Sequence, residues 1–148
     1  MHVVLLPWLA FGHMLPYLQL ARFLAQGGDK VSFVSTHRNI QRLPKPPPHL
    51  SPFIDFVKLA LPRVEEIPAD AEATVDVRSE DIHYLEKAYD GLGPELGQFL
   101  RSYCADWILH DFASLAAAHR GRARNSNSLS IHRGSLVPGL PRLIIDAA

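Results

Sequence analysis

The sequence has little that would support a disulfide framework, a membrane span or a strongly charged surface. Cys104 is the one cysteine among 148 residues, which excludes an intrachain disulfide framework and is typical of a reducing compartment. Lys and Arg together number 15, as do Asp and Glu, so no net charge indicates nucleic acid or an anionic membrane as partner. No uninterrupted apolar run reaches the about 20 residues of a transmembrane helix. We therefore expect a cytoplasmic protein with no stable membrane insertion.

Several common site motifs are also missing. Gly27 and Gly28 follow a predicted helix rather than a strand, and the glycine pattern of a dinucleotide-binding turn does not occur. A phosphate-binding P-loop is absent, and the eight histidines lack the spacing of a zinc-protease helix. One cysteine cannot build a thiolate zinc site. We expect neither a metal ion nor a bound cofactor.

What the sequence does contain is an alternation of strands and helices. A β-rich apolar run at 2–8, a helical pattern at 15–28 and a β-branched run at 30–36 predict a right-handed βαβ unit. Such a unit begins a doubly wound parallel sheet, so the fold class is α/β and Rossmann-like. Further along we expect helical turns at 37–43, strands at 53–61 and 105–112, a surface loop at 62–76, and two helices within 79–103.

The composition changes near residue 115. Residues 119–134 hold four arginines, no acidic residue and no periodicity, and we expect no packed element there. The arginines favour a poorly ordered basic tail, with contact to phosphate or nucleic acid as the alternative. The apolar run at 143–146 is compatible with one more strand.

Two polar residues follow predicted parallel strands. His13 comes after the first strand and Asp111 ends the strand at 105–112, so both side chains reach the same rim if those strands are neighbours. A histidine held by a carboxylate is suited to taking a proton from a hydroxyl. The simpler alternatives are a structural hydrogen bond for His13 and a helix cap for Asp111. Cys104 near His110 is compatible with a thiol nucleophile, although a buried structural cysteine is the commoner case.

Longer stretches resemble a known family. The phrases "PWLAFGHMLP", "VSFVST" and "RNI", followed by "LPRVEEIPADAEATVDV" and "ADWILHDFAS", are similar to the N-terminal part of plant family 1 UDP-glycosyltransferases. The resemblance covers residues 1 to about 114, in the same order and spacing. It is strongest to the branch that extends flavonoid and terpenoid glycosides, which includes rhamnosyltransferases.

The resemblance implies a GT-B enzyme, in which two Rossmann-like domains face each other across a cleft. It implies that His13 is the general base that deprotonates the acceptor hydroxyl, that Asp111 orients His13, and that sugar transfer from the UDP-sugar inverts the anomeric configuration without a metal. The acceptor entrance would be lined by Trp8, Phe11, Gly12, Met14, Tyr84 and Tyr89.

The sequence also departs from that family. After about residue 114 the resemblance ends, and the donor-site phrase "HCGWNS" is absent. We therefore expect an incomplete acceptor-binding N-terminal domain at 1–114, an aberrant, poorly ordered tail at 115–148, and no donor-binding domain. Such a chain would bind a small-molecule acceptor, would meet a UDP-sugar only if a donor domain is supplied, and would be inactive alone. The alternative is a non-catalytic α/β module that binds a small apolar molecule or a partner protein.

Overall fold

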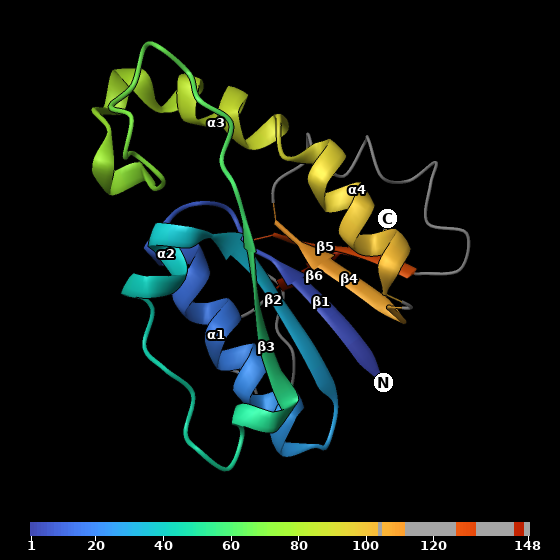
Figure 1. Cartoon of the computed structure of the whole chain (residues 1–148). Coiled ribbons are helices and arrows are strands. Elements are labelled where there is room, and N and C mark those ends of the chain that lie inside the picture. Colours follow the sequence, from blue (N-terminus) through green and yellow to red (C-terminus); the bar gives the residue numbers. More distant parts are fainter. Residues whose placement is uncertain (104, 112–126, 133–143, 147–148) are drawn as a thin grey trace.

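The computed structural model describes residues 1–103, 105–111, 127–132 and 144–146. Its centre is a sheet of six strands in the order β3-β2-β1-β4-β5-β6, in which neighbouring strands are parallel except for β5 and β6 (Figure 1). The strands are β1 (His2–Leu6), β2 (Lys30–Thr36), β3 (Ile54–Leu59), β4 (Trp107–His110), β5 (Asn127–His132) and β6 (Ile144–Asp146). The expected α/β fold with a parallel sheet is confirmed.

Helices cover both faces of this sheet. Helices α1 (Phe11–Gln26) and α2 (His37–Arg42) lie on one side, and α3 (Ile82–Asp90) and α4 (Gly93–Ser102) on the other (Figure 1). Short 3-10 turns, η1 (Ser51–Phe53), η2 (Thr74–Asp76) and η3 (Ser79–Asp81), punctuate the connections. The sequence predicts two helices within 79–103, and α3 and α4 are these two helices.

The sheet is buried on both sides because its strands are apolar at consecutive positions. In β1, Val3 and Leu5 pack with α1, whereas Val4 and Leu6 pack with α3 and α4. The first cluster joins the strands to Met14, Tyr17, Leu18 and Ala21 of α1, and the second joins them to Leu85, Tyr89, Leu92 and Leu96. The packing of the first strands with α1 therefore fixes the positions from which the loops at the carboxyl end of the sheet begin.

One helix boundary differs from the sequence-based expectation. Helix α1 begins at Phe11, four residues earlier than predicted, so His13 lies in its first turn and not in a preceding loop. The cause is a helix start that carries no side-chain signal: the N-cap is Ala10, which makes no side-chain cap hydrogen bond. The other end matches the prediction, since Gly27 caps the helix and Gly28 takes a positive φ of 86°.

The segment 62–76 is less exposed than a surface loop. Ala71 and Ala73 are buried, and η2 forms at its end. Strand β5 lies within 119–134, where the sequence showed no element, and β6 lies in the apolar run at 143–146. The four arginines of the tail and Cys104 lie outside the described residues, and the division at 114 stays a prediction.

Candidate functional site at the carboxyl rim of the sheet

The geometry of the candidate site follows from the pairing of β1 with β4. These strands are parallel neighbours with Leu6 opposite His110, so both chains leave the sheet at the same rim. Asp111 follows β4 directly, and the chain after β1 turns into α1 within a few residues. The rim therefore brings together two residues that are 98 positions apart in sequence, His13 and Asp111.

The Asp111 carboxylate is bonded on both oxygens. Its Oδ2 lies 2.6 Å from His13 Nδ1, and its Oδ1 accepts a hydrogen bond of 2.7 Å from the Trp8 backbone N–H. Because a carboxylate can only accept, His13 Nδ1 carries the proton in this contact. In the neutral ring Nε2 is then the unprotonated nitrogen with a lone pair. The arrangement fixes one tautomer of the imidazole and its orientation.

Exposure differs between the two partners. The Asp111 side chain is 8% exposed, whereas 33% of the His13 side chain remains open to solvent. A buried anion holds an imidazole that still reaches the surface. Such a pair can accept a proton from a bound hydroxyl and stabilise the imidazolium that results.

Two buried phenols lie near the same carboxylate. Burial raises the pKa of Tyr17 and of Tyr89, and the negative charge of Asp111 raises both further, so the two phenols stay neutral. The Tyr89 hydroxyl donates to the Pro7 carbonyl at 3.5 Å. The Tyr89 ring packs edge-to-face with the Trp8 ring, and the two ring centroids are 5.1 Å apart. Within the described residues, the Tyr17 hydroxyl has no hydrogen-bond partner. His13 and the Trp8 backbone N–H thus donate hydrogen bonds to the Asp111 carboxylate in largely apolar surroundings.

The residues predicted to line an acceptor entrance fall into two groups. Trp8 and Tyr89 are buried, and Met14 is fully buried in the core, where its sulfur accepts a hydrogen bond from Ser35 Oγ at 3.5 Å. The Met14 side chain therefore offers no surface in this structure, because the early start of α1 turns it toward the sheet.

The other three predicted lining residues do reach the surface. Phe11 and Tyr84 are half-buried and Gly12 is exposed beside His13. Gly12 has open space where a side chain would stand. Phe11 and Gly12 come directly before His13 in the first turn of α1. Tyr84 comes from α3, where its ring is tilted against that of His83, with the two ring centroids 3.9 Å apart.

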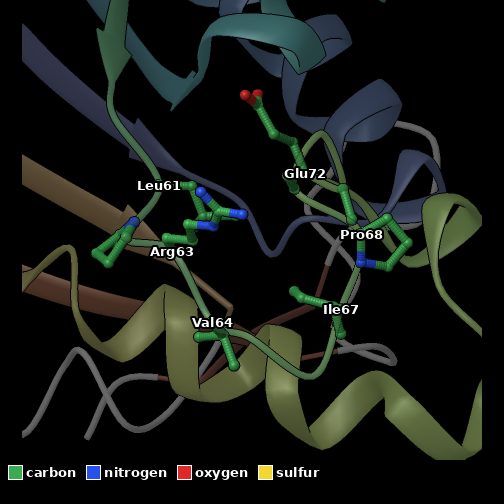
Figure 2. Close-up of a pocket in the computed structure, with 9 residues that line it drawn as sticks. Leu61, Arg63, Val64, Ile67, Pro68 and Glu72 are labelled. Atoms are coloured by element: carbon green, nitrogen blue, oxygen red, sulfur yellow. The ribbon is translucent and has the colours of Figure 1, made fainter.

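A small pocket lies in the connection after β3, apart from His13 and Asp111 (Figure 2). One stretch of chain lines it: Leu61, Pro62, Arg63, Val64, Ile67, Pro68, Ala69, Ala71 and Glu72. The Glu72 carboxylate accepts the backbone N–H of Arg38 at 2.6 Å, so its charge already stabilises the start of α2. Throughout the part of the chain described, no three His, Cys, Asp or Glu side chains gather as metal ligands would.

Sequence reasoning missed the contacts that surround this rim on the α2 side. Arg42 and Asp76 form an ion pair at 2.8 Å, and the backbone N–H of Thr74 donates to the carbonyl of Leu9 at 2.9 Å. The acidic segment at 62–76 carried no periodic signal that would have pointed to these partners.

No helix within the described ranges is both long and apolar enough to cross a bilayer.

Comparison with known proteins gives the site its context. No family model matches the chain. UDP-glycosyltransferase 91D1 of Stevia rebaudiana is 59% identical over 112 residues, which are 76% of this chain and 22% of that protein. The soyasaponin III rhamnosyltransferase of Glycine max is 47% identical over 114 residues, 77% of this chain and 24% of that protein. The chain thus spans about a quarter of the length of these curated relatives.

The fold is shared with solved plant enzymes. The crystal structure of Arabidopsis thaliana UGT89C1 complexed with quercetin matches 87% of this chain and 34% of its own, with a TM-score of 0.71 and 22% identity. This likeness shows the fold, and the sequence identities show the kinship that the phrases in the sequence indicated. Over about three quarters of its length, the chain is similar to plant UDP-glycosyltransferases.

Proposed function

We propose that this chain supplies the acceptor-activating half of a UDP-glycosyltransferase, with His13 as general base and Asp111 as the residue that orients it. The single observation that carries the proposal is the 2.6 Å contact between His13 Nδ1 and Asp111 Oδ2 at the rim of a parallel sheet. Ligands of open α/β sheets bind beyond the carboxyl ends of the strands, where this pair lies. His13 is the more exposed partner, and Nε2 is the nitrogen with a lone pair in the neutral ring.

The reaction would proceed as a direct displacement. His13 Nε2 accepts the proton of an acceptor hydroxyl while that oxygen forms a bond to the anomeric carbon of a UDP-sugar. The bond from the anomeric carbon to UDP breaks, UDP leaves with the electron pair, and the configuration inverts. Asp111 stabilises the imidazolium formed in this step. The pair needs no metal for its part in the proton transfer.

The proposed acceptor is a small plant metabolite that carries a free hydroxyl, such as a flavonoid or terpenoid glycoside. Support comes from relatives, since one curated relative is a soyasaponin III rhamnosyltransferase and one structural neighbour was solved with quercetin. Another structure of that neighbour holds UDP-L-rhamnose. Phe11 and Gly12 come directly before His13 and reach the surface, so they are the first candidates to contact the acceptor.

In this proposal residues 1–114 bind the acceptor, and residues 115–148 take no part in that binding. We expect the 148-residue chain to transfer no sugar by itself, because the matched segment is 22% of its Stevia relative. The test therefore joins residues 1–111 to the remainder of that relative, replacing the aligned segment. At 59% identity the exchanged segment keeps most of its packing partners.

The chimera is incubated with UDP-glucose or UDP-rhamnose and with acceptors that the parent enzyme uses, and products are separated by chromatography. We expect transfer that depends on both substrates, with the parent enzyme as the positive control. A chimera that folds and binds UDP like the parent but forms no product contradicts the proposal. Acceptor binding without transfer would favour the non-catalytic binding module.

A further inference from the structure

The Asp76 carboxylate lies in a nearly saturated set of hydrogen bonds. Arg42 donates to it through both terminal nitrogens, at 2.8 and 2.9 Å, and the backbone N–H groups of Glu72 and Ala73 donate at 3.0 and 2.9 Å. The side chain of Asp76 is 12% exposed and that of Arg42 is 28% exposed. A bidentate guanidinium–carboxylate pair of this kind fixes geometry as well as charge.

Helix α2 is tied to the same segment at further points. The fully buried Asn39 donates through Nδ2 to the Glu72 carbonyl at 2.6 Å and accepts from Arg42 at 2.6 Å through Oδ1. The backbone N–H of Arg38 adds the bond to the Glu72 carboxylate. We call α2 together with residues 72–76 the clamp. Its parts hold one another independently of the His13 region.

The clamp touches the chain on the N-terminal side of His13 twice. The Arg42 guanidinium lies over the Phe11 ring, 5.1 Å from its centroid. The Thr74 N–H donates to the Leu9 carbonyl at 2.9 Å. Leu9 and Phe11 belong to the turn that leads from β1 into α1, which is also held by the bond from Trp8 N–H to Asp111 and by the burial of Met14 in the core.

The turn has little stiffness of its own. Its helix start is capped by Ala10 without a side-chain hydrogen bond, so the first N–H groups lack that support. Gly12 adds backbone freedom in the first turn. Pro16, inside the helix, has no N–H to give to the Gly12 carbonyl four residues earlier. Contacts from outside must therefore set the direction in which His13 points.

We propose that Arg42 and Asp76 are positioning residues, which hold the Phe11 turn so that His13 Nδ1 meets Asp111. This inference rests on the proposed role of His13, although its test needs no catalysis. The clamp acts through the ring contact at Phe11 and the backbone bond at Leu9. Without it, the first turn of α1 loses two fixed points and the imidazole is free to leave Asp111.

The experiment reads the His13 tautomer in the full chain. Histidine is labelled with ¹⁵N, and spectra that join the ring nitrogens to the ring C–H protons show which nitrogen carries the proton. They are recorded at the alkaline end of a pH series, where the ring signals no longer change with pH, so that the spectrum is that of the neutral ring. A His13→Gln variant assigns the His13 signals. We expect the wild type to show the Nδ1–H tautomer alone.

In Arg42→Gln we expect this single pattern to be lost and a mixture of tautomers to replace it. The matched control is Arg38→Gln, on the same helix, which removes the exposed pair with Asp70 and should keep the wild-type pattern. Phe11→Leu removes only the ring under Arg42 and leaves the ion pair intact. It should also give a mixture, so the test survives if Arg42→Gln fails to fold.

The proposal is overturned if Arg42→Gln, or Phe11→Leu where that variant is the one that folds, keeps the single Nδ1–H tautomer. A wild type that already shows a mixture overturns it as well. The outcome is separate from the proposed function. A chimera that transfers no sugar leaves the tautomer result standing, and an active chimera with unchanged tautomers in the variants removes only the clamp.

Discussion

Two side-chain pairs that each contain a carboxylate, Arg42–Asp76 and His13–Asp111, join distant parts of the chain. Their members are 34 and 98 positions apart, and each pair has one largely buried carboxylate. Asp76 receives four hydrogen bonds, two of them from Arg42. Among the described residues Asp111 receives two, and the His13 imidazole binds it through Nδ1 while 33% of that side chain stays open to solvent. The first pair uses nearly all of its bonding capacity inside the protein, whereas the second exposes part of its imidazole.

The difference separates a structural role from a chemical one. A saturated pair fixes the position of the segments that carry it and has nothing left to offer a substrate. A pair with a free lone pair on a half-exposed ring can take up a proton. The contacts of Arg42 with Phe11 and of Thr74 with Leu9 join the two pairs, so the structural pair supports the chemical one.

The largest effect is expected when the chemical pair loses its charge. Asp111→Asn in the chimera should lower the transfer rate by about 10²- to 10⁴-fold, because an amide nitrogen facing Nδ1 favours the wrong tautomer and cannot stabilise the imidazolium. Steady-state kinetics at a fixed pH measure the loss, and circular dichroism checks the fold. A rate within a factor of two or so of the unmutated chimera would remove Asp111 from the mechanism.

The next effect is on stability. Arg42→Gln should lower the free energy of unfolding of the full chain by about 2–3 kcal/mol, because it leaves the largely buried Asp76 charge without its guanidinium. Arg38→Gln removes a pair whose carboxylate, on Asp70, is 75% exposed. It should cost at most about 1 kcal/mol. Urea unfolding compares the two, and equal losses would mean that the buried pair is no different from the exposed one.

The structural pair should also show itself in the pH dependence of stability. Burial alone would raise the pKa of Asp76, but the hydrogen bonds from Arg42 and the N–H groups of Glu72 and Ala73 outweigh it and hold the pKa below the ordinary 3.8. The native state thus binds this proton less tightly than the unfolded chain does. The stabilisation is complete above the ordinary pKa and is lost as the pH falls through the lower native value.

We therefore expect wild type and Asp76→Asn to differ most in melting temperature near pH 6, and the difference to shrink as the pH falls below 3.8. Calorimetry over this range measures it. A difference that stays constant down to the lowest pH at which the chain folds would show that the charge of Asp76 contributes nothing.

The smallest effect is expected at Tyr17. Its buried hydroxyl has no partner within the described residues, so Tyr17→Phe should change the free energy of unfolding by no more than about 0.5 kcal/mol, or stabilise the chain slightly. The His13 tautomer should stay as in the wild type. A loss above about 1 kcal/mol would reveal a third partner for Asp111 or a bound water at this hydroxyl.

Much of this architecture could be predicted from the sequence because local signals were strong. The apolar runs at β1, β2 and β4 and the helical spacing within α1 gave the parallel sheet. The rule that parallel strands share a carboxyl rim placed His13 and Asp111 on one rim if their strands are neighbours, and the pairing of β1 with β4 meets that condition. The start of α1 could not be predicted, because Ala10 carries no capping side chain. Because the predicted helix began only at residue 15, the burial of Met14 was not predicted either.

The clamp was out of reach for a different reason. Asp76 lies in η2, in a segment without periodicity and 34 positions after Arg42, so nothing local marks the two as partners. An acidic stretch with two prolines is typical of a solvated loop, and only the tertiary fold shows that Asn39 and Arg42 supply donors to it.

The most direct test of His13 as the base replaces it with alanine and compares the rate with that of the same substitution at a histidine outside the site. His49 is exposed in the connection between α2 and η1, so His49→Ala in the chimera should keep the unmutated rate. His13→Ala should lower the rate of sugar transfer by about 10²- to 10⁴-fold, the usual contribution of a general base, while the chimera still binds acceptor and UDP. Equal rates for the two variants would contradict the role of His13.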